Sequence, residues 1–315
     1  MSHLCKYCYG RGVRTTKRSL FENKYVRTDL ACESGRVAPA DCKGAVYERK
    51  EYESITVERL NVLNESGEEE TGKEIGCYVT VSGAAVRLDL GQDTVLSSII
   101  EKEIRRLCEK TVGITITKST RVLVAGVGNA MISSDSLGPM TAEMISPTRH
   151  LMSVDEFKFL ECSEVSVIKT AVLGQTGIES SELIKSICEK ISPDIVVTVD
   201  ALAARSVSRL ASTIQLSDTG ISPGSGIGNA RRHIDKKALG VPVISIGVPT
   251  VVDSATLIFD TLDEAGIEEL DDRIIKTLEN SRSFFVTPKD CDFVNQRISR
   301  ILSNAIGEVF GCKDL

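Results

Sequence analysis

The chain has 315 residues, of which 42% are hydrophobic and 26% charged, an ordinary globular composition for one large domain or two smaller ones. Its net charge of −6 argues against direct nucleic-acid binding, and no apolar run approaches the ~20 residues that a membrane-spanning helix needs. The N-terminus lacks the apolar core of a secretory signal.

The ten cysteines are scattered along the chain, which favours reduced thiols in a cytoplasmic protein over a disulfide framework. Cys5 and Cys8 form a C-x-x-C pair with His3 nearby, but a structural zinc site needs four ligands and no second close pair follows. The pattern therefore favours a terminal tail over a metal site, and we expect neither a metal nor another cofactor.

The first part of the chain differs in composition from the rest. Residues 1–20 contain five Lys or Arg and no Asp or Glu, without a clear period, so we interpret residues 1–25 as an extension. Residues 26–315 are expected to form one α/β domain with a β-rich part at about 36–90. Within that part we predict strands over 44–63 and 77–81, joined by an acidic surface loop at 64–74.

From residue 93 onward, helical and strand patterns alternate. Apolar residues at helical spacing predict a helix over 93–110 with Asp93 as its cap, and another helix near Ser136. Further strands are predicted at 121–126, 164–174, 194–202, 212–218 and 241–249, and further helices at 179–191, 250–264, 269–279 and 290–309. This alternation indicates a parallel sheet covered by helices on both faces, with the apolar strands 121–126 and 195–199 in its centre.

The stretch SDTGISPGSGIGN (217–229) matches three motifs, none of which fits its surroundings. A pepsin-like site needs two Asp-Thr-Gly copies, and a single copy could serve only across a dimer. A serine-hydrolase elbow needs a backbone N–H after the nucleophile, where this chain has Pro223. A dinucleotide fingerprint needs glycine at the position of Asn229.

Two aspartates at strand ends are better candidates for catalysis. Asp135 lies in a loop after strand 121–126, and Asp200 follows strand 195–199 directly. Sites in open α/β sheets form beyond the carboxyl ends of strands, so neighbouring strands would bring both carboxylates to one crevice. Two carboxylates held close cannot both ionise easily, so one could act as an acid and the other could activate water. Ordinary roles as a helix cap or a loop anchor remain open for each.

Small and polar residues near these strand ends are expected to form the wall of the site. Glycines there let the main chain approach a substrate closely, and their N–H groups could stabilise an oxyanion. The predicted wall comprises Gly126, Gly128, Asn129, Gly138, Asp218, Gly220, Gly224 and Gly226.

Long segments of the chain resemble the germination protease family of spore-forming bacteria. The matching segments are RTDLACE (27–33), YVTV (78–81), GVGNAMISSDSLGP (126–139), GQTGIE (174–179), VVTVDALAARS (196–206), STIQLSDTGISPGSGIGNAR (212–231), LGVPVISIGVPTVVD (239–253) and FVTPKD near 285–290. The resemblance implies a three-layer αβα sandwich with a mostly parallel sheet, similar to hydrogenase maturation proteases.

The same resemblance implies the activity. It predicts an endopeptidase of the spore core that degrades small acid-soluble spore proteins at germination, with an atypical aspartic mechanism that uses Asp135 and Asp200. It also predicts a homotetramer made as a zymogen that removes its own N-terminal propeptide. We place that boundary between Leu20 and Arg27, near Phe21-Glu22, because the family favours cuts after Glu. The alternatives are a metal-dependent processing peptidase and a non-catalytic paralogue that binds spore proteins.

Overall fold

The structure is a computed structural model that describes residues 28–31, 43–152, 154–155, 159, 161–224, 231–267, 273 and 284–313. The predicted extension, the predicted cut position and Cys5 and Cys8 lie outside these residues, as does the predicted helix over 269–279 apart from Arg273.

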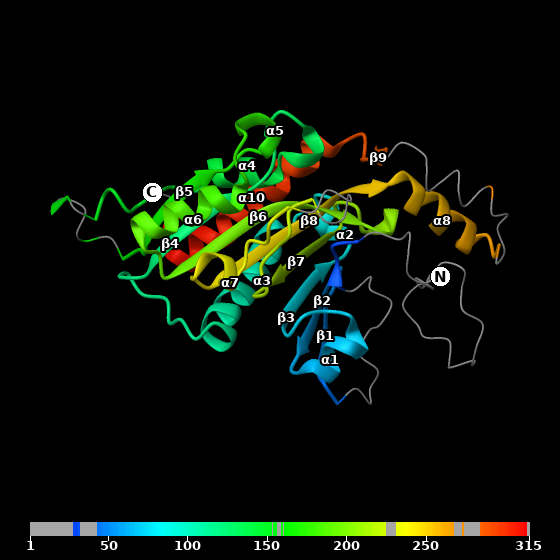
Figure 1. Cartoon of the computed structure of the whole chain (residues 1–315), viewed down its shortest axis with the longest axis horizontal. Helices are drawn as coiled ribbons and strands as arrows, with labels where there is room; N and C mark the ends of the chain where they lie inside the picture. The colour runs from blue at the N-terminus through cyan, green and yellow to red at the C-terminus, as the bar shows by residue number, and fades with distance from the viewer. Residues whose placement is uncertain are drawn as a thin grey trace.

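One nine-stranded sheet runs through the molecule (Figure 1). Its strands are β1 (Ala45–Tyr52), β2 (Ile55–Val62), β3 (Gly76–Ser82), β4 (Arg121–Gly126), β5 (Glu164–Lys169), β6 (Ile195–Ala204), β7 (Thr213–Ser217), β8 (Val243–Asp253) and β9 (Phe285–Val286). The order is β1-β2-β3-β7-β8-β6-β4-β5, with β9 paired to β8. The predicted β-rich part, β1 to β3, therefore continues the same sheet as the later strands.

The sheet has a parallel half and an antiparallel half. The pairs β5–β4, β4–β6 and β6–β8 are parallel, whereas β8–β7, β7–β3, β3–β2, β2–β1 and β8–β9 are antiparallel. The α/β class is confirmed, with a parallel part smaller than the resemblance implied. Only Glu53 and Ser54 join β1 to β2, and so short a connection can join antiparallel strands but not parallel ones.

The described helices are α1 (Glu65–Thr71), α2 (Ala84–Arg87), α3 (Asp93–Arg106) with a π-helical continuation η3 (Leu107–Thr111), α4 (Leu137–Glu143), α5 (Leu173–Thr176), α6 (Ser180–Ile191), α7 (Lys236–Leu239), α8 (Ser254–Glu264) and α10 (Cys291–Phe310), with 3₁₀ turns η4 (Ser133–Asp135) and η6 (Val207–Arg209). Of these, α3, α4 and α10 pack on one face of the parallel half, and α6 and α7 pack on the other. Figure 1 shows α4 and α10 together beside the long strands β6 and β8.

Alternation along the strands assigns side chains to the two layers. On β4, Val122 and Val124 join a large buried cluster with residues of α3 and α10, whereas Leu123 and Ala125 pack with Ile184 of α6 on the opposite face. Both faces of β4 are therefore buried, as expected for a central parallel strand, and this accounts for its unbroken apolar run.

Four predictions about secondary structure differ from the observed elements. Residues 65–71, predicted as a loop, form α1, because the Asn64 side chain accepts a hydrogen bond from Gly67 N (3.1 Å) and Gly72 ends the helix in the left-handed region. Asp93 does not cap α3; its carboxylate accepts a hydrogen bond from Arg297 Nε (3.0 Å).

The strand predicted over 164–174 ends at Lys169 and is followed by the short helix α5. The helix predicted from 250 begins only at Ser254, because β8 continues through Asp253. The Asp253 carboxylate then accepts hydrogen bonds from Ala255 N (3.0 Å) and Thr256 N (3.1 Å), as a helix cap does.

Two further expectations concern the described part of the chain. Its six cysteines are free thiols and all are buried. None of the helices in these residues is long and apolar enough to cross a membrane.

Candidate active site

A cavity of about 410 Å³ opens beyond the end of β4 and alongside the last part of β6. It contains the side chains of both predicted catalytic residues, Asp135 and Asp200, together with Asp29 from the start of the described chain. The rest of its wall is largely apolar, with Val127, Ile132, Val172, Leu173, Leu202, Pro223, Val251 and Phe285. Low polarity around the carboxyl groups makes their ionisation costly.

Asp200 lies within β6, between β4 and β8. Its side chain is only 4% exposed, and Ala201 N donates a hydrogen bond to its Oδ1 (2.9 Å). Beyond this point β6 continues to Ala204 while β4 has already ended at Gly126, so the edge of β6 that faced β4 opens toward the cavity.

Asp135 reaches the cavity from the 3₁₀ turn that follows β4. Its Oδ2 accepts a hydrogen bond from Asn129 N (2.8 Å), which fixes the carboxyl group against the loop. Gly128 packs against Asp135 and has a φ of +119°, and a Cβ at that position would be 2.3 Å from Asp135 O. Only glycine allows this loop conformation so close to Asp135.

The two carboxyl groups have different electrostatic surroundings. Burial, followed by the neighbouring charge of Asp135 and that of Asp29, raises the pKa of Asp200 well above its ordinary value, against one opposing hydrogen bond from Ala201 N. Burial also raises the pKa of Asp135, while the hydrogen bond from Asn129 N lowers it. Asp200 is therefore the group that holds a proton and Asp135 the group that ionises more readily.

Two glycines bring these loops together. A Cβ on Gly126 would be 2.2 Å from Gly138 O, and a Cβ on Gly138 would be 2.2 Å from Val127 O and 2.3 Å from Val199 O. The first turn of α4 thus packs directly on the end of β4 and on the middle of β6. These glycines allow close packing between parts of the chain, and neither belongs to the cavity lining.

The other predicted wall residues are divided among several places. Gly128 and Gly224 line the cavity, whereas Gly220 lines a neighbouring cavity of about 210 Å³. Asn129 contacts Asp135 through its N–H, and its side-chain oxygen accepts a hydrogen bond from Gln175 Nε2 (2.8 Å). Asp218 lines neither cavity; its Oδ1 accepts a hydrogen bond from Cys77 N (2.7 Å). Gly226 lies outside the described residues.

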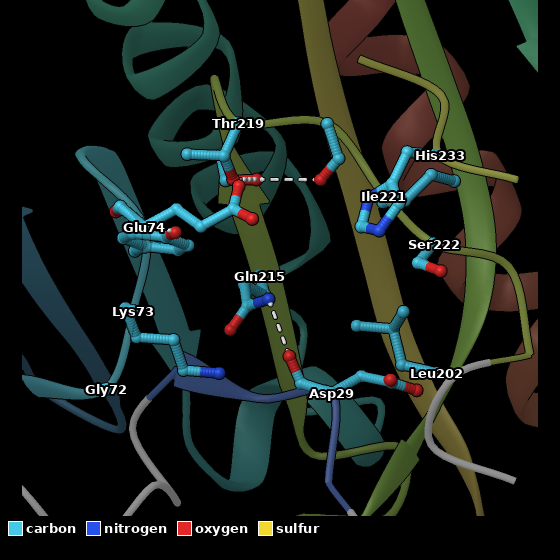
Figure 2. A pocket seen from close by; sticks show the side chains of 13 residues that line it. Asp29, Gly72, Lys73, Glu74, Leu202, Gln215, Thr219, Ile221, Ser222 and His233 are labelled. Atoms are coloured by element: carbon cyan, nitrogen blue, oxygen red, sulfur yellow. Dashed lines mark hydrogen bonds between the residues drawn. The ribbon is translucent and has the colours of Figure 1, made fainter. Parts of the chain in front are cut away.

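The neighbouring cavity is polar and includes most of the SDTGISPG stretch (Figure 2). Ser222, the nucleophile of the rejected elbow motif, donates its hydroxyl to Arg231 O (3.1 Å) and lines this cavity. His233 lies there as well and is exposed. The stretch thus separates two cavities, with Pro223 and Gly224 on the side of the two aspartates.

Asp29 and Gln215 were not identified as site residues from the sequence. Asp29 lines both cavities and raises the pKa of Asp200, and Gln215 lines the polar cavity. Asp29 lies within the matching segment RTDLACE, so its acidic side chain was a usable signal. Gln215 sits on a short strand whose pattern indicated only a strand.

A metal-dependent peptidase, one of the alternatives raised above, would need several ligand side chains close together. Within the described ranges, no group of three or more His, Cys, Asp or Glu side chains is arranged to hold a metal ion.

The chain matches one protein family over most of its length. The model of the germination protease family matches residues 24–265. Germination proteases from Caldanaerobacter subterraneus subsp. tengcongensis and Clostridium tetani are 36% and 38% identical to it, each over 89% of this chain and over 93% and 94% of their own length. The germination protease of Oceanobacillus iheyensis is 41% identical over 76% of this chain and 67% of its own.

Among solved structures, a NiFe hydrogenase maturation protease from Thermococcus kodakarensis aligns with 61% of this chain and 92% of its own. The TM-score is 0.34 and the sequence identity 17%, values at which the alignment supports no inference about chemistry.

Proposed function

Since the chain belongs to the germination protease family, a family of peptidases associated with germination, we propose that it is an endopeptidase that hydrolyses peptide bonds with Asp135, Asp200 and one water molecule. The observation that supports this most directly is the shared cavity: the carboxyl groups of Asp200 on β6 and of Asp135 in the turn after the adjoining strand β4 both line it, and their surroundings separate their affinities for a proton.

The difference between the two carboxyl groups assigns their roles. Asp135, the more readily ionised, takes a proton from water as the water oxygen attacks the scissile carbonyl carbon. Asp200 holds its proton and gives it to the departing amide nitrogen when the C–N bond breaks. Asp135 is then protonated and Asp200 ionised, and exchange with solvent restores the starting state. The balance of atoms requires only water and the peptide.

We also propose that the protein is made as a zymogen that removes residues 1–25 or a segment of similar length by self-cleavage. This extends the family resemblance. The position of Thr28–Ala31 supports it, because a segment just after the proposed propeptide lies against β6 next to the two aspartates.

The proposed substrates are small acid-soluble spore proteins, the proposed setting is the core of the germinating spore, and the proposed assembly is a homotetramer. These three statements derive from the family resemblance. We propose no direct role for nucleic acid or membranes.

The mechanism is tested with purified, processed protein and a small acid-soluble spore protein as substrate. Asp135→Asn and Asp200→Asn should each lower kcat by about 10²–10⁴-fold, because each removes one proton-transfer step while preserving side-chain shape. Asp194→Asn is the control. Asp194 directly precedes β6, at the end of that strand remote from Asp200, and pairs with Arg121 at the surface, so this substitution should leave kcat within about twofold. Full activity of either active-site variant would refute the pair.

The alternatives give different results in the same assay. A metal-dependent peptidase would lose activity on exhaustive chelation and regain it with a divalent ion, whereas the proposed enzyme should be unaffected. A non-catalytic paralogue would bind the spore protein without cleaving it, before and after removal of its N-terminal residues.

A further inference from the structure

A short segment at the start of the described chain, Thr28–Ala31, is held at the junction of the two cavities. Asp29 and Leu202 line both the cavity that contains the two aspartates and the polar cavity beside it. The segment therefore occupies the place where a peptide entering either cavity would cross to the other.

One side chain contacts the main chain of this segment twice. Gln215 Oε1 accepts a hydrogen bond from Ala31 N (2.5 Å), and Gln215 Nε2 donates one to Asp29 O (3.2 Å). Figure 2 shows the Gln215 amide directed at the Asp29 carbonyl across the base of the polar cavity. A carboxamide that both donates to and accepts from peptide groups recognises a main chain whatever its side chains are.

The opposite side of the segment is held by the main chain of β6. Asp29 N donates to Ala203 O (3.0 Å), and Ala203 N donates to Asp29 Oδ2 (2.8 Å). Ala203 is three residues beyond Asp200 on the same strand, past the point where β4 ends. A peptide bound at this edge thus adds to a free part of the sheet close to the catalytic pair.

An apolar pocket anchors the segment between these two contacts. Leu30 is fully buried and packs with Leu202, Ala204, Leu210 and Val252, a cluster separate from the main core. The segment is thus bound by hydrogen bonds on both sides and by one buried side chain, the combination by which proteins bind peptide strands.

We propose that Gln215, the main chain of Ala203 and the Leu30 pocket together form a docking site for the main chain of the peptide substrate, which the chain's own residues 28–31 occupy in cis. This inference rests on the proposed function and names where the substrate binds. Substrate and residues 28–31 compete for the site, and Gln215 is a binding residue that does not take part in the chemistry.

Peptide binding to the full chain tests the proposal, in an Asp135→Asn background so that no cleavage occurs. The probe is a fluorescent peptide of residues 27–33 with Cys32→Ser, and its Kd is measured by anisotropy. Ala31→Pro in the protein removes the N–H that donates to Gln215 and should free the site. The Kd should therefore fall at least about tenfold relative to the unsubstituted chain, because the cis competitor is weakened.

Adding Gln215→Leu to the Ala31→Pro protein should raise the Kd at least about tenfold. Gln296→Leu, a substitution of an exposed glutamine on α10, is the matched control and should leave the Kd unchanged. Equal binding with and without Gln215→Leu, or no binding to the Ala31→Pro protein, would overturn the proposal. Leu30→Asp frees the site by a second route if the proline variant does not fold, as judged by circular dichroism.

Modified peptides provide a test that needs no further protein variant. Methylation of the peptide nitrogen of residue 31 removes the donor to Gln215 and should weaken binding, whereas methylation at residue 30 removes an N–H that donates to Thr28 Oγ1 within the segment (3.1 Å) and should weaken it much less. Equal loss from both would contradict the docking site. Because all readouts are binding, a protein that binds as expected but cleaves nothing would refute the proposed function alone.

Discussion

A side chain at position 138 has no room. The Cβ of an alanine there would lie 2.2 Å from Val127 O, just after β4, and 2.3 Å from Val199 O, in the middle of β6, and both are main-chain atoms. Gly138→Ala must therefore push α4 away from β4 and β6, which should lower the free energy of unfolding by about 1–3 kcal/mol or more. Because Asp135 directly precedes this helix, kcat should fall as well.

Gly174→Ala is the matched control for this stability measurement. Nothing lies within 4 Å of a Cβ at position 174, and its residue is in the helix α5, so alanine should be neutral or slightly stabilising. Thermal and urea unfolding monitored by circular dichroism compare the two variants. If both unfold like the unsubstituted protein, Gly138 has another role.

At the scale of elements, the turn that carries Asp135 is held by parts of the chain far away in sequence. Thr250 Oγ1 on β8 donates to Ser134 O (2.5 Å), and Asn295 Nδ2 on α10 donates to Ser133 O (2.8 Å). These contacts fix the turn from two sides. Thr250 and Asn295 are thus positioning residues for Asp135.

Replacing the Thr250 hydroxyl tests this support. Thr250→Val keeps the shape but removes the donor to Ser134 O, so Asp135 should move and kcat should fall about 10–100-fold with little change in KM. Thr250→Ser retains a hydroxyl and should recover most of the activity. Thr198→Val on β6 is the control, because the buried Thr198 hydroxyl has no hydrogen-bond partner to lose. Equal kcat values for Thr250→Val and the control would rule out the positioning role.

These contacts mark the limit of what the sequence could predict. The placement of Asp135 and Asp200 in one cavity was predictable, because apolar runs identify central parallel strands and cavities in open α/β sheets form near the carboxyl ends of such strands. The contacts of Thr250, Asn295 and Gln215 were not predictable, because they join residues distant in sequence. The antiparallel half of the sheet was not predictable either, because the pattern of residues in a strand does not specify which strand it pairs with. The helix α1 was missed although Asn64 gave a cap signal.

At the scale of the whole molecule, the sheet buries an acid at its centre. The pKa of Asp200 is raised well above the 3.8 of a free aspartate, so the folded protein binds a proton at Asp200 that the unfolded chain has lost. Between these two pKa values the folded state binds more protons than the unfolded state, and stability falls as pH rises. The buried carboxyl group that we propose as the proton donor is therefore a cost to the fold at neutral pH.

Asp200→Asn should remove this cost. Relative to the unsubstituted protein, its Tm should be similar near pH 4 and higher near pH 8, by about 2–4 °C for each kcal/mol of burial cost relieved. Asp194 provides a control of opposite sign: Arg121 lowers its pKa, so it stabilises the fold above the unfolded pKa and loses that effect as pH falls. Asp194→Asn should thus lower the Tm slightly at pH 8. If the Tm difference between Asp200→Asn and the unsubstituted protein does not grow with pH, Asp200 ionises in the folded protein as freely as in the unfolded chain. That result would refute the assignment of Asp200 as the proton donor.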